Sequence, residues 1–270
     1  MRDDIAGHVA AYEQTVRSMI ALAETLAPDD WERPTECPGW TVRDQVSHVV
    51  GVERWMLGES DPEHPLPDDI PHVRNDFGRA LEVAVDVRRS VPGPKVVDEL
   101  RDVLDRRLAA LPAADPDRPV TLPSGRPGTY VELMKFRAFD IWTHEQDIRR
   151  AVGRPGNLDA PAAERARDII TSGFPFVVGK RAAAAPGQSV TLEVTGPLAG
   201  TLHVAVGPDG RAGFADPPPA GNPPTVTLRM DWETYARLAS GRITADAADV
   251  AITGDPDLAH RVLHGMAITP

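Results

Sequence analysis

The chain has 270 residues, of which 41% are hydrophobic and 26% charged, proportions typical of a soluble globular protein with one or two domains. Its formal net charge of −11 argues against nucleic-acid binding, which requires a basic surface. No apolar run approaches the roughly 20 residues that cross a bilayer. Met1–Asp4 lead into an amphipathic pattern without a signal-peptide core, and the single cysteine, Cys37, excludes an internal disulfide. We therefore expect a cytoplasmic protein that binds neither nucleic acid nor a membrane.

The first two thirds of the chain has the three- and four-residue apolar spacing of amphipathic helices. Helices are predicted over residues 5–26, 41–57, 72–90, 95–111, 129–152 and 161–181. Thr41 followed by Asp44 has the spacing of a capping box, which predicts the start of the second helix. Prolines and aspartates at 62–71, and prolines and glycines at 123–128, predict connecting loops.

The period of the pattern changes after residues 186–187. Alternating apolar and polar residues predict half-buried strands at 190–194, 201–206 and 225–230. Asp231 and Asp255 are the N-caps expected of two short helices that follow. Strands followed by helices are typical of a small α+β domain. We place the domain boundary near residue 184, which gives domains of residues 1–183 and 184–270.

The predicted helix 129–152 has an unusual polar sector. Asp140 and His144 are four residues apart, so a carboxylate and an imidazole lie one turn apart on one face. Arg137 and Asp147 fall in the same sector, flanked by apolar residues, and buried charges are costly unless they are paired or bind a metal. The opposite arc is predicted to face water; it comprises Lys135, Thr143, Glu145, Gln146, Arg149 and Arg150.

His48, at the margin of the apolar arc of helix 41–57, is the natural third partner. Asp44 lies one turn earlier and is expected to orient the His48 imidazole as a hydrogen-bond acceptor. His48, Asp140 and His144 would together form a two-histidine, one-carboxylate metal site with open coordination positions. The alternative from the same residues is an internal salt-bridge network without metal, and the spacing alone leaves both interpretations open.

Two segments resemble a known family. Cys-Pro-Gly-Trp-Thr-Val-Arg-Asp-Gln-Val-Ser-His at 37–48 resembles the first motif of the mycothiol-dependent maleylpyruvate isomerase family, and 139–148 looks like its second metal motif. Segments 240–242 and 252–259 are similar to its C-terminal domain. The resemblance implies an N-terminal all-α DinB-like four-helix bundle and a small C-terminal α+β sterol-carrier-like domain.

The resemblance also implies a ligand set and a chemistry. A divalent metal, most often zinc, would be held by His48, Asp140 and His144, where Asp140 replaces the glutamate of the isomerase itself. With Asp44, Arg137 and Asp147 as supporting residues, the metal would activate the thiolate of a mycothiol cosubstrate. The reaction would be S-transfer to, or cis–trans isomerisation of, a small-molecule electrophile. Two alternatives are a non-catalytic protein that binds a metal or an apolar ligand, and a non-haem iron(II) enzyme.

Overall fold

The computed structural model describes residues 5–218 and 221–269, so Met1–Asp4 lie outside the described residues. The chain divides into two compact units, residues 1–162 and 163–270. The boundary between these units, at 162/163, lies earlier in the chain than the predicted boundary at 183/184, which rested on the change in the period of the apolar pattern. The helical segment from 163 to 181 belongs to the second unit, because its last turns pack against strand and helix elements there.

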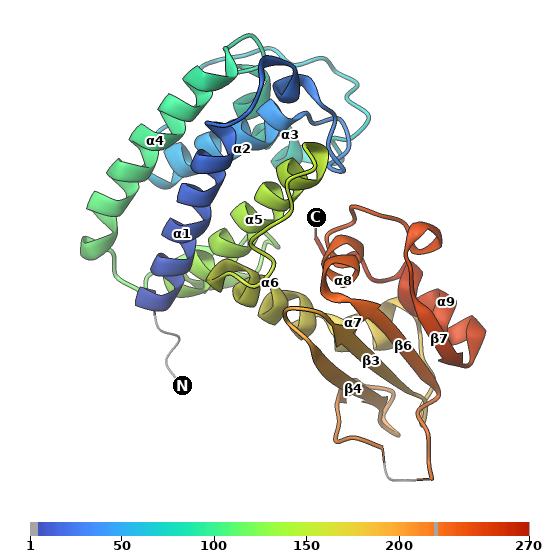
Figure 1. Cartoon of the computed structure of the whole chain (residues 1–270). Helices are drawn as coiled ribbons and strands as arrows, with labels where there is room; N and C mark the ends of the chain where they lie inside the picture. Colours follow the sequence, from blue (N-terminus) through green and yellow to red (C-terminus); the bar gives the residue numbers. More distant parts are fainter. Residues whose placement is uncertain (1–4, 219–220, 270) are drawn as a thin grey trace. The chain divides into compact units, whose positions relative to one another are not determined.

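The first unit is mostly helical. Its helices are α1 (Ile5–Ala23), α2 (Val42–Met56), α3 (Asp76–Asp86), α4 (Gly93–Ala110) and α5 (Tyr130–Ala151), with 3₁₀ turns at Pro28–Glu32 and Leu111–Ala113. Helix α1 packs against α4 and α5, and α2 packs against α3, α4 and α5 (Figure 1). The loop expected at 123–128 lies within a short antiparallel hairpin, which the sequence did not predict. The hairpin consists of β1 (Pro119–Thr121) and β2 (Pro127–Thr129).

Two capping boxes fix where the site-bearing helices begin. The Asp44 carboxylate accepts from the backbone N–H of Thr41 at 2.9 Å, and the Thr41 hydroxyl accepts from the backbone N–H of Asp44. Thr129 and Glu132 form the same reciprocal arrangement at the start of α5. Each box satisfies backbone donors that a helix N-terminus leaves free. The predicted starts of both helices are confirmed to within one residue.

The arc of α5 that was expected to face water is buried in part, so that prediction was wrong. Glu145 is 0% and Gln146 is 3% exposed. The chain after α5 folds back over this face: Gln146 donates to the carbonyl of Gly156 at 3.0 Å, and Asn157 donates to the Glu145 carboxylate at 2.7 Å. Glu145 also accepts from Thr15 of α1 at 2.9 Å, so this arc forms an interface.

The second unit contains a five-stranded sheet in the order β5-β4-β3-β6-β7, in which β3 and β6 are parallel and the other neighbours antiparallel. The strands are β3 (Ser189–Thr195), β4 (Gly200–Val206), β5 (Ala212–Phe214), β6 (Val226–Asp231) and β7 (Ala251–Gly254). The predicted strands correspond to β3, β4 and β6, whereas β5 and β7 were not predicted.

Helices accompany this sheet. The predicted helix 161–181 is divided into α6 (Pro161–Ser172), α7 (Phe174–Phe176) and a π-helical turn at Val177–Arg181. Helices α8 (Trp232–Ala239) and α9 (Pro256–His264) pack on β3, β6 and β7, and a 3₁₀ turn spans Ala245–Ala247. Asp231 and Asp255 cap α8 and α9 as expected. Within the described residues, no helix has the length and hydropathy of a membrane span.

Candidate metal centre

Helices α2 and α5 bring the three candidate ligands together. His48 Nε2 lies 3.4 Å from Asp140 Oδ2, and His144 Nε2 lies 3.6 Å from Asp140 Oδ1. The two imidazole centroids are 4.4 Å apart, and one ligand atom from each residue lies within 4.8 Å of the others. The Asp140 side chain is 19% exposed, against 4% for His48 and 8% for His144, so solvent reaches the cluster at the carboxylate.

These separations are compatible with a bound metal. Ligand atoms at about 2.0–2.2 Å from a tetrahedral zinc ion lie roughly 3.3–3.6 Å from one another. Each imidazole Nε2 lies at such a distance from one Asp140 oxygen, Oδ2 for His48 and Oδ1 for His144, and both distances exceed the roughly 2.7–2.9 Å of a strong charge-assisted hydrogen bond. Two imidazoles and one carboxylate are also donors that suit zinc and other divalent first-row metals.

The protonation states of His48 and Asp140 are those that metal binding requires. Burial lowers the pKa of His48 to about 4, so the imidazole is neutral at neutral pH and keeps a lone pair for a cation. Burial alone would raise the pKa of Asp140, but the Arg137 guanidinium and the two adjacent imidazoles hold it well below its ordinary value. The carboxylate is therefore ionised. Metal ligands must be deprotonated in this way.

Gln45, on α2, fixes the orientation of His144. His144 Nδ1 lies 2.5 Å from Gln45 Oε1, and the Gln45 amide nitrogen donates to Thr35 Oγ1 at 2.6 Å. Since the amide oxygen only accepts, Nδ1 carries the proton and Nε2 presents its lone pair towards Asp140. Sequence reasoning missed Gln45. The available signal was an uncharged polar residue three positions before His48 on a helix face with apolar neighbours.

Arg137 and Asp147 lie beside the cluster, as their sector of the helix predicts. Arg137 Nη1 is 2.5 Å from Asp140 Oδ2, and the Arg137 side chain is only 4% exposed. Asp147 Oδ2 is 3.7 Å from His144 Nδ1, and the other Asp147 oxygen accepts from Arg150 at 2.7 Å. Arg137 thus contacts the carboxylate ligand directly, while Asp147 lies at the outer nitrogen of His144.

Asp44 does not orient His48, so that expectation was wrong. One Asp44 oxygen accepts from the backbone of Thr41, and the other lies 3.3 Å from Arg89 Nε. The capping geometry directs the carboxylate towards the start of α2. Among the described residues, His48 Nδ1 is a buried nitrogen without a hydrogen-bond partner.

The Trp40 indole packs against both imidazoles. Its ring centroid is 5.1 Å from that of His48 and 5.7 Å from that of His144. The indole Nε1 donates to Glu82 Oε2 of α3 at 2.9 Å, which holds the ring in this position. Nothing local in the sequence distinguishes an indole that faces a site from one in a core.

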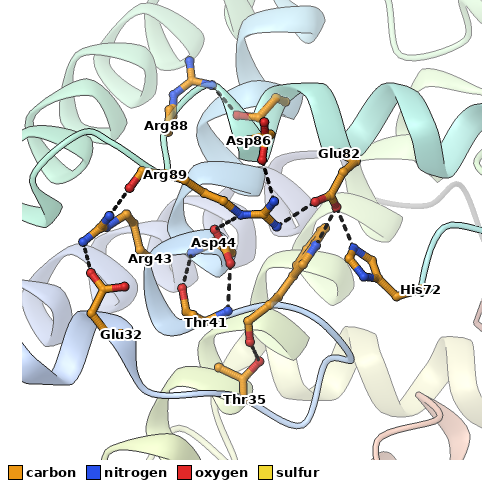
Figure 2. A network of polar contacts seen from close by, with 12 residues as sticks. Glu32, Thr35, Thr41, Arg43, Asp44, His72, Glu82, Asp86, Arg88 and Arg89 are labelled. Carbon is orange, nitrogen blue, oxygen red and sulfur yellow. Dashed lines mark hydrogen bonds and ion pairs between the residues drawn. The ribbon is translucent and has the colours of Figure 1, made fainter. Parts of the chain in front are cut away.

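The Glu82 carboxylate connects the Trp40 indole to the loop that precedes α3 (Figure 2). Its carboxylate is almost fully buried and also contacts His72 Nε2 at 2.8 Å and Arg89 Nη2 at 2.6 Å. Arg89 in turn bridges to Asp44 and Asp86. The loop that carries His72 is thereby tied to the same carboxylate as the Trp40 indole.

Fold and site define a two-unit protein whose helical unit assembles a candidate two-histidine, one-carboxylate metal centre. Two family models match the sequence: "Mycothiol maleylpyruvate isomerase N-terminal domain" matches residues 12–149, and "MDMPI C-terminal domain" matches residues 164–261. The chain therefore belongs to the mycothiol-dependent maleylpyruvate isomerase family. The resemblance predicted from its two motifs is confirmed.

Individual proteins are more distant. The chain is 25% identical over 189 residues to "Uncharacterized protein Rv0036c" of Mycobacterium tuberculosis and to "Uncharacterized protein MT0041" of a second strain, covering 67% of this chain and 70% of each relative. It is similar in fold to the crystal structure of the mycothiol-dependent maleylpyruvate isomerase, with a TM-score of 0.55, 14% identity and 93% of each chain covered. A histidine-to-alanine mutant of that isomerase gives a TM-score of 0.54 at 14% identity, over 92% of this chain and 93% of the mutant. A mostly helical N-terminal region and a sheet-containing C-terminal domain are shared.

Proposed function

We propose that this protein is a mycothiol-dependent metalloenzyme whose divalent metal, zinc in the simplest case, is held by His48, Asp140 and His144. The observation that carries the proposal is the convergence of one ligand atom from each residue, on α2 and α5, within 4.8 Å of the others. Membership of the isomerase family supplies the thiol. The reaction we infer is S-transfer to, or cis–trans isomerisation of, a small electrophile.

The donor set suits thiol activation. Three protein ligands leave a coordination position open, and a zinc ion there lowers the pKa of a bound thiol so that thiolate is available at neutral pH. Bound to a metal, one carboxylate and two imidazoles offset only half of a divalent charge. Gln45 keeps the His144 tautomer fixed, and Trp40 excludes water from one side of both imidazoles.

Two finer assignments belong to this proposal. We favour a transferase-like member over the isomerase itself, because Asp140 stands where the resemblance places glutamate. We also propose that the helical unit is a DinB-like four-helix bundle and that the second unit is sterol-carrier-like. The packing of α1, α2, α4 and α5, and a mixed sheet with accompanying helices, support these assignments.

The test is metal analysis of the purified, zinc-reconstituted protein, together with turnover of chlorodinitrobenzene or a bimane in the presence of mycothiol. Wild type should hold stoichiometric metal and lose mycothiol-dependent turnover on chelation. His144→Ala should lose both metal and turnover. His264→Ala, which alters an exposed histidine of α9, is the matched control and should retain both. Wild-type protein without bound divalent metal would defeat the proposal, and turnover that survives chelation would defeat the metal's role.

A further inference from the structure

Glu53 of α2 is a fully buried carboxylate behind the candidate ligands. It is 0% exposed and accepts three hydrogen bonds: from Tyr12 Oη at 2.9 Å, from Arg107 Nε at 2.8 Å and from Arg137 Nε at 2.9 Å. Burial alone would raise the pKa of Glu53, but the two guanidiniums outweigh it and keep the carboxylate ionised. A buried ion of this kind needs such partners, because an unpaired charge in a protein interior is strongly unfavourable.

Arg137 is shared between this buried carboxylate and the metal centre. Its Nε donates to Glu53 while its Nη1 lies 2.5 Å from Asp140 Oδ2. Arg137 precedes Asp140 by three residues, so both side chains project from one face of α5. Two carboxylates therefore compete for one guanidinium, and Asp140 is also the single anionic ligand of the candidate centre.

We propose that Glu53 is a positioning residue of the metal centre. Because Glu53 shares Arg137 with Asp140, the guanidinium orients the Asp140 carboxylate while the negative charge of Asp140 stays available to a divalent cation. The inference rests on the proposed function, since it concerns the same site. Without the Glu53 charge, Arg137 has Asp140 as its main counter-ion. The guanidinium then competes with the metal for the carboxylate, and its positive charge is no longer offset beside the cation.

The experiment is the zinc dissociation constant of the metal-free protein, measured by competition with a chromogenic chelator. Glu53→Gln keeps the size of the side chain but removes its charge, and should weaken zinc binding by about 10–100-fold, as loss of an outer partner of a metal ligand does. The charge-preserving Glu53→Asp should stay within about threefold of wild type. If Glu53 mattered only through packing, the shorter aspartate would be at least as damaging as glutamine.

A double-mutant cycle isolates the route through Arg137. In an Arg137→Gln background, adding Glu53→Gln should change the zinc dissociation constant less than about threefold, because Glu53 acts on the centre through that guanidinium. This comparison remains decisive where Glu53→Gln alone does not fold. A further tenfold loss in that background, or wild-type affinity in folded Glu53→Gln, would overturn the inference.

Glu145→Gln is the matched control, because Glu145 is also 0% exposed and accepts from several donors, including Thr15 and Arg149. It belongs to α5 but its network faces α1, so zinc affinity should change less than about threefold. A loss as large as that of Glu53→Gln would overturn the inference. The outcomes separate the two proposals: wild type without zinc affinity defeats the proposed function, whereas equal affinity of wild type and Glu53→Gln defeats only the role of Glu53.

Discussion

His144 Nδ1 lies 2.5 Å from Gln45 Oε1, so the imidazole of α5 is oriented by a residue of α2. Helix α2 thus contributes both His48 as a candidate ligand and the group that sets the tautomer of the other histidine. Gln45 is itself held by its bond to Thr35, just before the Cys37–Trp40 turn. The first sequence motif therefore acts at both histidines of the centre.

Removing the Gln45 acceptor should weaken metal binding. Gln45→Leu leaves the Nδ1–H of His144 unsatisfied and the imidazole free to turn, and we expect zinc affinity to fall about 10–100-fold. Gln45→Glu retains an acceptor and should bind zinc at least as tightly as wild type. Chelator competition measures both. Gln146→Leu is the control: its buried amide donates to a carbonyl away from the ligands, so zinc affinity should hold.

The metal-free protein should become less stable as the pH is lowered, because of His48. Its pKa is about 4 in the folded protein against an ordinary value of about 6.5, so the unfolded chain takes up the proton first. The contribution of neutral His48 to the free energy of unfolding is complete above about pH 6.5 and is lost as pH falls towards about 4. Urea unfolding, followed by circular dichroism at several pH values, should show a steeper decline for wild type than for His48→Gln. Parallel pH profiles would contradict this assignment.

The Cys37–Trp40 turn should be intolerant of a side chain at Gly39. Its φ is +78°, and an added Cβ would lie 2.1 Å from His72 Nδ1, the ring that contacts Glu82. We expect Gly39→Ala to destabilise the protein by about 1–3 kcal/mol, because backbone strain and a steric clash add. Gly58→Ala is the matched control, since its φ is +83° with no atom within 4 Å of the added Cβ. Thermal unfolding should show a smaller loss of stability for Gly58→Ala. Equal losses of stability in the two variants would exclude a contribution from the clash with His72.

The helices that carry the centre were predictable because their signals are local. Apolar spacing and the Thr41 and Asp44 capping pair define α2, and the inward sector of α5 places Asp140 and His144 on one face. The structure brings His48 to that face, as its position at the margin of the apolar arc suggested. Periodicity captures these features because they repeat within one element.

The supporting residues were not predictable in the same way. Gln45 and Glu53 interrupt the apolar pattern of α2, yet their partners lie far along the chain, and a sequence does not state which polar residue meets which. Asp44 was given the wrong partner because capping competes for the same carboxylate. The domain division at 162/163 was missed because it follows from packing rather than from a change of period.

The buried face of α5 should contribute strongly to stability. Glu145 accepts hydrogen bonds from Thr15, Ser18, Arg149 and Asn157 at 2.7–2.9 Å. Glu145→Gln removes the charge from a site inaccessible to water and replaces an acceptor by a donor, which leaves part of the network unsatisfied. We expect the free energy of unfolding to fall by about 2–4 kcal/mol.

The control is Glu13→Gln, which breaks an exposed pair with Arg17 on α1 and should change the free energy of unfolding by less than about 0.5 kcal/mol. Urea unfolding of the metal-free protein, followed by ellipticity at 222 nm, compares the two variants in the same helical unit. Similar small losses for both would mean that the Glu145 network is no stronger than a surface ion pair. A large loss confined to Glu145→Gln would show that the buried face of α5 around Glu145 anchors α1.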